Sequence, residues 1–96
     1  MQLERRDIKK GLSKKGFVET ESHHTYFHHE YGGKRTGIYT YLSHGAAYKT
    51  YQKALLSNMK RQLKLDSIRQ IVDLCQCPMS HDEYNDILRA KGFITD

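Results

Sequence analysis

Hydrophobic residues recur along this 96-residue chain with two different periods, and each period predicts one type of element. Between residues 25 and 42, apolar residues and threonines alternate with histidine, tyrosine and charged residues on either side of a Gly32-Gly33 turn. Alternation with a period of two, interrupted by a glycine turn, is typical of a β-hairpin. The run 17–21 just before it predicts a further strand of the same sheet.

Three- and four-residue spacing predicts helices in other parts of the chain. A first helix over 4–15 carries Ile8 and Leu12 on one face and ends before Gly16. A longer helix over 46–63 has five large apolar or aromatic residues on one face. These are Tyr48, Tyr51, Leu55, Met59 and Leu63.

The order of these elements indicates the α+β class. Residues 1–65 form a helix, three strands and a helix, an order that packs both helices on one face of a three-stranded antiparallel sheet and leaves the other face open. Residues 66–96 add two helices separated by Pro78, and Ser80 with Glu83 forms a capping box at the start of the second. We expect this acidic extension to pack on the same domain.

The predicted hairpin has two unlike faces. Pairing about the glycine turn places Glu30 opposite Arg35, Phe27 opposite Ile38, Tyr26 opposite Tyr39 and His24 opposite Tyr41. The face expected to pack on helices carries Thr25, Phe27, Thr36, Ile38, Thr40 and Leu42. The open face carries His24, Tyr26, His28, Arg35, Tyr39 and Tyr41. Such side chains suit stacking on bases, although tyrosine and histidine are also ordinary residues of exposed strands. His23 belongs to the other face from His24 and is expected to be buried or half-buried against a helix.

Two groups of side chains have partial metal-ligand character. His24 and His28 would have zinc-ligand spacing on a helix, but a strand separates them by about 13 Å. Cys75, Cys77 and His81 offer three ligands without a second pair that would complete a four-ligand site. We therefore expect no metal and no other cofactor, and we interpret Cys75 as a small core residue.

Charge is distributed unevenly over the chain. Residues 1–64 hold thirteen Lys and Arg against five Asp and Glu, a net of +8, whereas residues 65–96 hold three against six, a net of −3. The basic part favours a polyanionic partner such as nucleic acid, and ordinary solvated lysines are the alternative. The sequence lacks an apolar run of membrane-spanning length and a recognisable signal peptide, so we expect a cytoplasmic protein without membrane association.

The order and spacing of several short motifs between residues 4 and 65 resemble the HicA-like (YcfA-like) family of small RNA-cleaving toxins. These motifs are Arg5-Arg6-Asp7, Lys15-Gly16-Phe17, Ser22-His23-His24, Ser43-His44-Gly45, Leu55-Leu56 and Leu63-Lys64-Leu65. The resemblance implies a double-stranded-RNA-binding-domain-like fold, metal-independent cleavage of mRNA and inhibition by a HicB-like antitoxin. It implies a catalytic role for His24, with Ser22 at the matching serine. Glu21 stands where the family usually has glycine.

Metal-independent RNA cleavage uses the neighbouring 2′-hydroxyl as nucleophile, so the protein has to move protons and stabilise charge on the phosphate. His24 is the expected general acid or base, because histidine titrates near neutral pH. Ser22 and Tyr41 are the expected supporting groups. A second proton carrier is not assigned.

Phosphate binding is expected at the start of the long helix, where free backbone amides and the helix dipole attract anions. The residues expected there are His44, Gly45, Lys49 and Lys53. In the alternative interpretation, His44 only caps a turn that Gly45 permits. Further RNA contacts are expected from Tyr26, Tyr39, Arg35, Arg5 and Arg6.

Two other functions are consistent with the sequence. The first is a non-catalytic RNA-binding protein on the same fold, which Glu21 and the unassigned proton carrier favour. The second is a protein-interaction module whose acidic helices bind an antitoxin or another copy of the chain.

Overall fold

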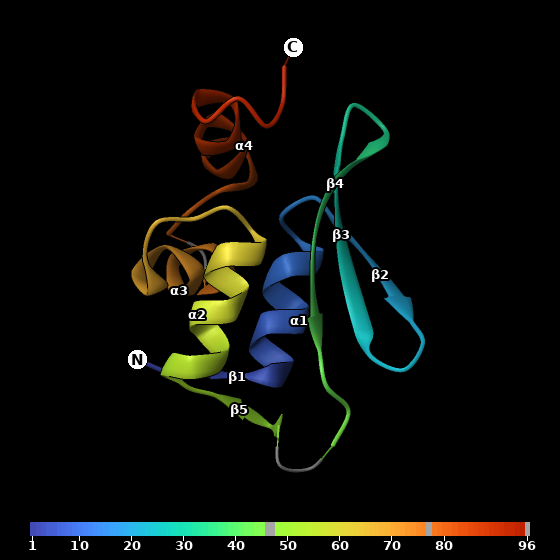
Figure 1. Cartoon of the computed structure of the whole chain (residues 1–96), viewed down its shortest axis with the longest axis vertical. Coiled ribbons are helices and arrows are strands. Elements are labelled where there is room, and N and C mark those ends of the chain that lie inside the picture. The colour runs from blue at the N-terminus through green and yellow to red at the C-terminus, as the bar shows by residue number, and fades with distance from the viewer. Residues whose placement is uncertain (46–47, 77, 96) are drawn as a thin grey trace.

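The computed structural model describes residues 1–45, 48–76 and 78–95, which form four helices and two small antiparallel sheets (Figure 1). In chain order the elements are β1 (Leu3–Glu4), α1 (Arg5–Ser13), β2 (Phe17–Glu21), β3 (Thr25–Tyr31), β4 (Lys34–Leu42), β5 (Thr50–Tyr51), α2 (Lys53–Gln62), α3 (Ile68–Gln76) and α4 (His81–Ala90). Strands β2, β3 and β4 pair in that order, and β1 pairs with β5. The α+β class and the three-stranded antiparallel sheet are confirmed, whereas the β1–β5 pair is not among the predicted elements.

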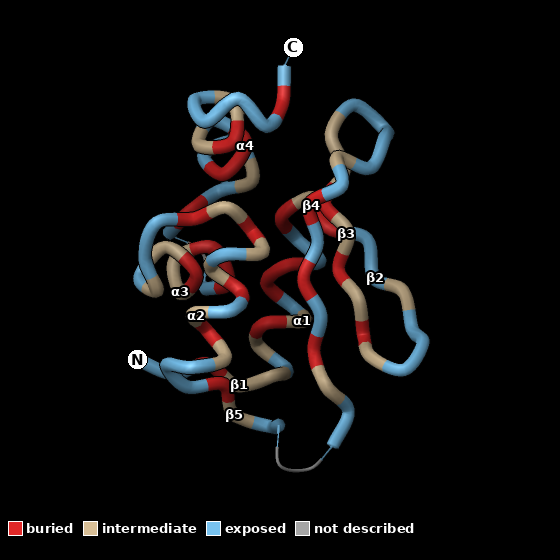
Figure 2. Tube along the Cα trace, in the orientation of Figure 1, coloured by how far each residue is buried: buried red, intermediate tan, exposed pale blue. Residues whose placement is uncertain are grey.

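The helices lie on one side of the three-stranded sheet. Helix α1 contacts β2, helix α2 contacts β4, and helix α3 packs against α1 and α2 on the side away from the sheet (Figure 1). One core runs through these layers, as the buried segments in Figure 2 show. Its fully buried members include Ile8, Leu12, Phe27, Leu56, Ile71, Leu74, Tyr84 and Leu88.

Strands β3 and β4 have the predicted faces but not the predicted register. Glu30 pairs with Arg35 as expected, but Tyr26 pairs with Tyr41, and Phe27 with Thr40 in place of the predicted Ile38. The shift arises because a single residue of β3 faces residues 36–38 of β4, a bulge in which Gly37 has a φ of 88° that favours glycine. A shift of two residues leaves each side chain on its face, so the sequence-based division into buried and open faces still holds.

The turn between β2 and β3 differs from its prediction. Ser22, His23 and His24 form a bend that precedes β3, whereas the motif comparison places them at the start of a strand. His23 is exposed, so the prediction that it is buried is wrong. Turn residues no longer alternate between the faces of the sheet, which removes the basis of that prediction.

The long helix predicted over 46–63 is also shorter than expected. Helix α2 begins at Lys53, because Thr50 and Tyr51 pair with Glu4 and Leu3 in the β1–β5 sheet. Residues 46 and 47 lie outside the described residues. Tyr51 continues the helical spacing of the apolar residues but belongs to the short strand β5. Periodicity alone therefore does not locate the start of the helix.

The two C-terminal helices follow the prediction closely. The capping box at α4 is present: the Ser80 hydroxyl accepts from the Glu83 amide, and the Glu83 carboxylate accepts from the Ser80 amide. No helix of the described residues combines the length and apolar character needed to cross a membrane.

Candidate functional site

The open side of the three-stranded sheet carries five rings in mutual contact. The ring centroid of Tyr26 lies 5.8 Å from that of Tyr41 and 6.2 Å from that of Tyr39. His28 is 6.0 Å from Tyr26 and 5.8 Å from Tyr39. His24 completes the group, and we call these five residues the aromatic face. Alternation along β3 and β4 places four of the rings on this side, because neighbouring residues of a strand point to opposite sides of the sheet, and His24 reaches them from the turn before β3.

His24 lies at the edge of the aromatic face, close to Tyr41. Their ring centroids are 4.9 Å apart, and the Tyr26 ring is 6.1 Å from His24. The ring of His24 is half-buried, and its Nδ1 atom is buried without a hydrogen-bond partner among the described residues. Ser22 is exposed in the same turn, and its amide donates to the His24 carbonyl over 3.0 Å. The predicted nearness of His24 and Tyr41 is thus present, although the strand partner of Tyr41 is Tyr26 and not His24.

His28 and Arg35 extend the open side toward the hairpin turn. Partial burial lowers the pKa of His28, and the positive charge of Arg35 lowers it further, against an opposing effect of Glu30. A lowered pKa keeps the imidazole neutral at pH 7. The His28 Nε2 atom lies 3.2 Å from the Thr20 hydroxyl. His28 is a neutral ring suited to stacking. It is not among the residues predicted to contact RNA, although its alternation with Tyr26 is visible in the sequence.

Of the four residues predicted to bind phosphate at a helix start, only Lys53 lies at one. His44 and Gly45 follow β4, Lys49 precedes β5, and Lys53 is the first residue of α2. The prediction of a single phosphate site at the helix N-terminus is therefore wrong. All four residues are exposed, and each stays a candidate RNA contact on its own.

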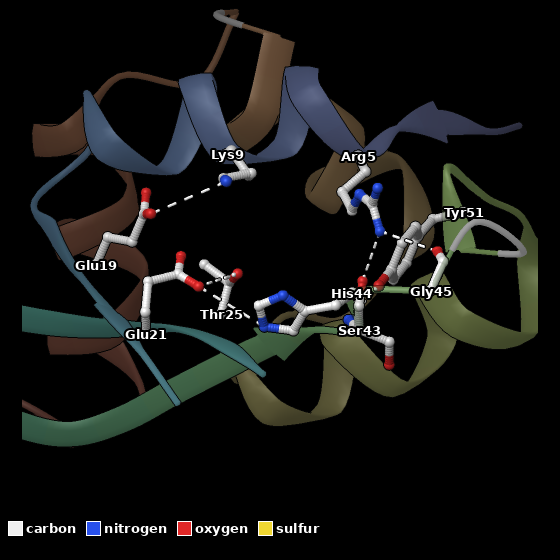
Figure 3. A network of polar contacts seen from close by, with 9 residues as sticks. All are labelled: Arg5, Lys9, Glu19, Glu21, Thr25, Ser43, His44, Gly45 and Tyr51. Carbon is white, nitrogen blue, oxygen red and sulfur yellow. Dashed lines mark hydrogen bonds and ion pairs between the residues drawn. The ribbon is translucent and has the colours of Figure 1, made fainter. Parts of the chain in front are cut away.

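His44 forms an ion pair with the carboxylate of Glu21. Its Nε2 atom is 3.6 Å from Oε2 of Glu21, and the Thr25 hydroxyl donates to the same oxygen over 3.1 Å (Figure 3). The hydrogen bond from Thr25 lowers the pKa of Glu21, and the charges of His44 and Lys9 act in the same direction. Glu21 and Thr25 belong to the helix-covered side of the sheet, since they pair with each other in the ladder beside buried residues.

Arg5 is a structural residue at the same end of the sheet. Its Nη1 atom donates to the carbonyl of Ser43 over 2.7 Å and to that of Gly45 over 3.1 Å (Figure 3). Arg6 differs, because its side chain is highly exposed and its only ion pair among the described residues is a long one of 3.9 Å to Asp7. Arg5 and Arg6 line one surface pocket with Glu4 and Lys49. Of the two arginines, Arg6 has the freer guanidinium for an RNA contact.

The described residues contain no cluster of metal ligands. Within the described part of the chain, no three His, Cys, Asp or Glu side chains are placed to bind a metal ion together. Cys77 lies outside the described residues. Cys75 is buried, and its burial raises the pKa of the thiol to about 12, so the thiol stays protonated.

The candidate residues thus form two groups at the sheet. The aromatic face holds His24, Tyr26, Tyr39 and Tyr41, and the helix-covered side of the sheet end holds His44 with Glu21. The pair of Glu21 and His44 escapes a reading of the sequence, because 23 positions separate the two residues. No family model, curated protein or solved structure matches this chain.

Proposed function

We propose that this protein is a HicA-like ribonuclease that binds single-stranded RNA on its aromatic face and cleaves it without a metal ion. The observation that carries the proposal is the His24 imidazole, which lies 4.9 Å from the Tyr41 ring at the edge of the aromatic face. The helix, three strands and helix of the first 62 residues are consistent with a double-stranded-RNA-binding-domain-like arrangement. A HicB-like antitoxin is the corresponding proposed partner.

Exposed rings on a sheet are a common means of binding unpaired bases. Each base stacked on an aromatic side chain contributes about 1–3 kcal/mol to the binding free energy, largely independent of which base it is. Tyr39 is 47% exposed and Tyr41 39%, which leaves ring surface for stacking. The basic residues around the sheet supply attraction to the backbone, so affinity for RNA falls as salt rises.

In the proposed reaction, His24 takes the proton of the 2′-hydroxyl while that oxygen attacks the adjacent phosphorus. Histidine suits the step because its neutral and protonated forms both exist near pH 7. Tyr41, with its ring 4.9 Å from the imidazole, fixes the position of the ring. Ser22 holds the backbone of the turn, because its backbone amide donates a hydrogen bond to the His24 carbonyl.

The test of catalysis compares wild type, His24→Ala and His23→Ala with single-stranded RNA in EDTA. We expect His24→Ala to lose about 100-fold or more in rate. His23 is a matched control, because it is an exposed histidine of the same turn. Equal residual cleavage by wild type and His24→Ala would remove His24 from the mechanism.

The test of the binding surface measures RNA affinity for Tyr39→Ala and Tyr48→Ala. Tyr48 is 40% exposed, similar to Tyr39, and lies between β4 and β5, outside the aromatic face. We expect Tyr39→Ala alone to weaken binding, by about 10-fold for one lost stacking contact. Equal affinities of the two variants would argue against the aromatic face as the binding surface.

A non-catalytic RNA-binding protein is the second candidate. The observation that favours it is the Glu21 carboxylate, which is ionised near pH 7 and repels phosphate at the sheet end that carries both His24 and His44. Tight, salt-sensitive binding that leaves the RNA intact would support this candidate over the ribonuclease.

A further inference from the structure

The backbone on both sides of His44 is held in place by hydrogen bonds. Arg5 donates to the carbonyls of Ser43 and Gly45, and the Ser43 amide donates to the hydroxyl of Tyr51 over 2.9 Å (Figure 3). Tyr51 is itself buried beside the core. The loop after β4 therefore presents the His44 side chain from a fixed position.

The imidazole of His44 is oriented as well as its backbone. The Glu21 carboxylate lies 3.6 Å from Nε2, and the buried Thr25 side chain holds that carboxylate through a 3.1 Å hydrogen bond. The side chain of His44 remains 49% exposed. An imidazole that is held by a carboxylate and still open to solvent has the arrangement of a proton-transfer group, in which the carboxylate fixes the ring and balances its positive charge.

His44 and His24 emerge from the same end of the sheet. Thr25 pairs with Leu42 at the last rung of the β3–β4 ladder, so His24 just precedes that rung and His44 follows it by two residues. His24 turns toward the aromatic face, where it meets Tyr41, and His44 turns toward Glu21 on the helix-covered side. Both imidazoles therefore belong to the end of the sheet that an RNA strand leaving the aromatic face at His24 would cross.

We propose that His44 is the second proton carrier of the cleavage reaction, acting as general acid, and that Glu21 is its positioning residue. This inference rests on the proposed function. The 2′-oxygen forms a bond to phosphorus as its proton passes to His24, and the bond from phosphorus to the 5′-oxygen breaks as that oxygen takes a proton from His44. The products are a 2′,3′-cyclic phosphate and a 5′-hydroxyl, and proton exchange with water restores both histidines.

The test uses two RNA substrates that differ in one atom. After the cleavage position is mapped on ordinary RNA, the 5′-bridging oxygen at that position is replaced by sulfur, a leaving group that departs without being protonated. Wild type, His24→Ala, His44→Ala, Glu21→Gln and the control His23→Ala are compared on both substrates in EDTA. Circular dichroism melts show that each variant is folded.

We expect His44→Ala to be slower by about 100-fold on the oxygen substrate and close to wild type on the sulfur substrate. His24→Ala is slow on both, because the 2′-hydroxyl still has to lose its proton. Glu21→Gln is slower on the oxygen substrate and displaces the alkaline limb of its pH–rate profile, whereas a purely structural role of Glu21 would leave that limb in place.

The possible failures have different signatures. His44→Ala that matches wild type on oxygen, or is equally slow on both substrates, overturns the role of His44 and leaves the proposed function intact. A faster Glu21→Gln variant shows that the carboxylate competes with phosphate for His44 and overturns its positioning role. If the wild-type protein cleaves neither substrate, the proposed function fails and this inference fails with it.

Discussion

The Glu21 carboxylate shows how one side chain acquires its properties from its neighbours. Thr25 donates a hydrogen bond to it, His44 and Lys9 contribute positive charge, and all three lower its pKa. Because the folded pKa lies below that of the unfolded chain, the stabilisation is complete above about pH 4.5 and is lost as the pH falls through the folded value. Near pH 7 the carboxylate is fully ionised.

At this scale we predict that Thr25→Val raises the Glu21 pKa more than His44→Gln does. The hydrogen bond from Thr25 has the largest effect on that pKa, and valine keeps the shape of threonine without the hydroxyl. Carboxyl chemical shifts followed by NMR as a function of pH measure the change directly. A larger effect of His44→Gln would show that charge, not the hydrogen bond, dominates.

Arg5 and His44 show what the sequence could reveal about single residues and what it could not. The chemistry of each side chain is evident from the sequence, and the nearness of His24 to Tyr41 is present although the observed pairing partner of Tyr41 is Tyr26. Arg5, however, binds two backbone carbonyls some 40 residues away, which cannot be seen in local sequence patterns. The charge of Arg5 therefore suggests an RNA contact, whereas in the structure its guanidinium is hydrogen-bonded to the backbone after β4.

The contact between α1 and α3 depends on a glycine. A Cβ atom on Gly11 would lie 2.1 Å from the carbonyl oxygen of Cys75, so the helix backbones touch at this point. Neither backbone can move aside as a flexible side chain can. This contact therefore fixes the distance between α1 and α3 at Gly11.

We predict that Gly11→Ala destabilises the protein by about 2 kcal/mol, because the helices must separate. The result is diagnostic, since alanine in a helix interior would otherwise stabilise by about 1 kcal/mol. Ser13→Ala is the matched control, an exposed position of the same helix. Urea unfolding measures both variants, and a stabilised Gly11→Ala would show that the helices do not touch as described.

The elements themselves were predictable where contacts are local. The capping box at α4 and the alternation in the hairpin depend on neighbouring residues and agree with the structure. The start of α2 and the β3–β4 register depend on a pairing with β1 and on a bulge at Gly37. Both are long-range or irregular features, which periodicity does not encode.

The molecule as a whole has one core to which the C-terminal helices belong. The buried Lys15 ammonium donates to the carbonyl of Leu74 over 2.9 Å and to that of Met79. The Tyr84 hydroxyl donates to the Leu63 carbonyl over 2.8 Å. The described residues of the C-terminal part are therefore hydrogen-bonded to the turn after α1 and to the C-cap of α2, and α3 packs against both helices.

We predict that a fragment of residues 1–65 does not fold cooperatively. It lacks seven buried side chains that complete the core, each contributing about 1.5–3 kcal/mol, against a typical total stability of 5–15 kcal/mol. These are Ile71, Leu74, Cys75, Met79, Tyr84, Leu88 and Ile94. Circular dichroism and urea unfolding test this, and a sigmoidal transition in the fragment would contradict it.

A buried histidine makes the stability of the whole molecule depend on pH. The His29 ring is sealed between Thr36, at 3.0 Å from Nδ1, and Asn85 of α4, at 2.9 Å from Nε2. Burial lowers the pKa of His29, the charge of His81 lowers it further, and the bond to Asn85 acts in the opposite direction. The neutral ring is the form that links β3 to α4.

We predict that the free energy of unfolding falls below about pH 6.5, by up to about 1.4 kcal/mol per pH unit for this one proton. The sign follows because the unfolded chain binds the proton more tightly than the folded protein does. Urea unfolding near pH 5 and pH 7.5 should show a smaller difference in His29→Gln than in wild type. The exposed control His23→Gln should keep the wild-type difference, and an unchanged difference in His29→Gln would contradict the prediction.

Strand β2 forms one edge of the three-stranded sheet, and its Glu19 and Glu21 side chains point to the helix-covered side. Glu19 lies 3.9 Å from Lys9 of α1, and Glu21 contacts His44. A strand from another polypeptide that added to this edge would have to settle beside two carboxylates. The same acidic residues that shape the sheet end thereby protect a small, tyrosine-rich sheet against edge-to-edge aggregation.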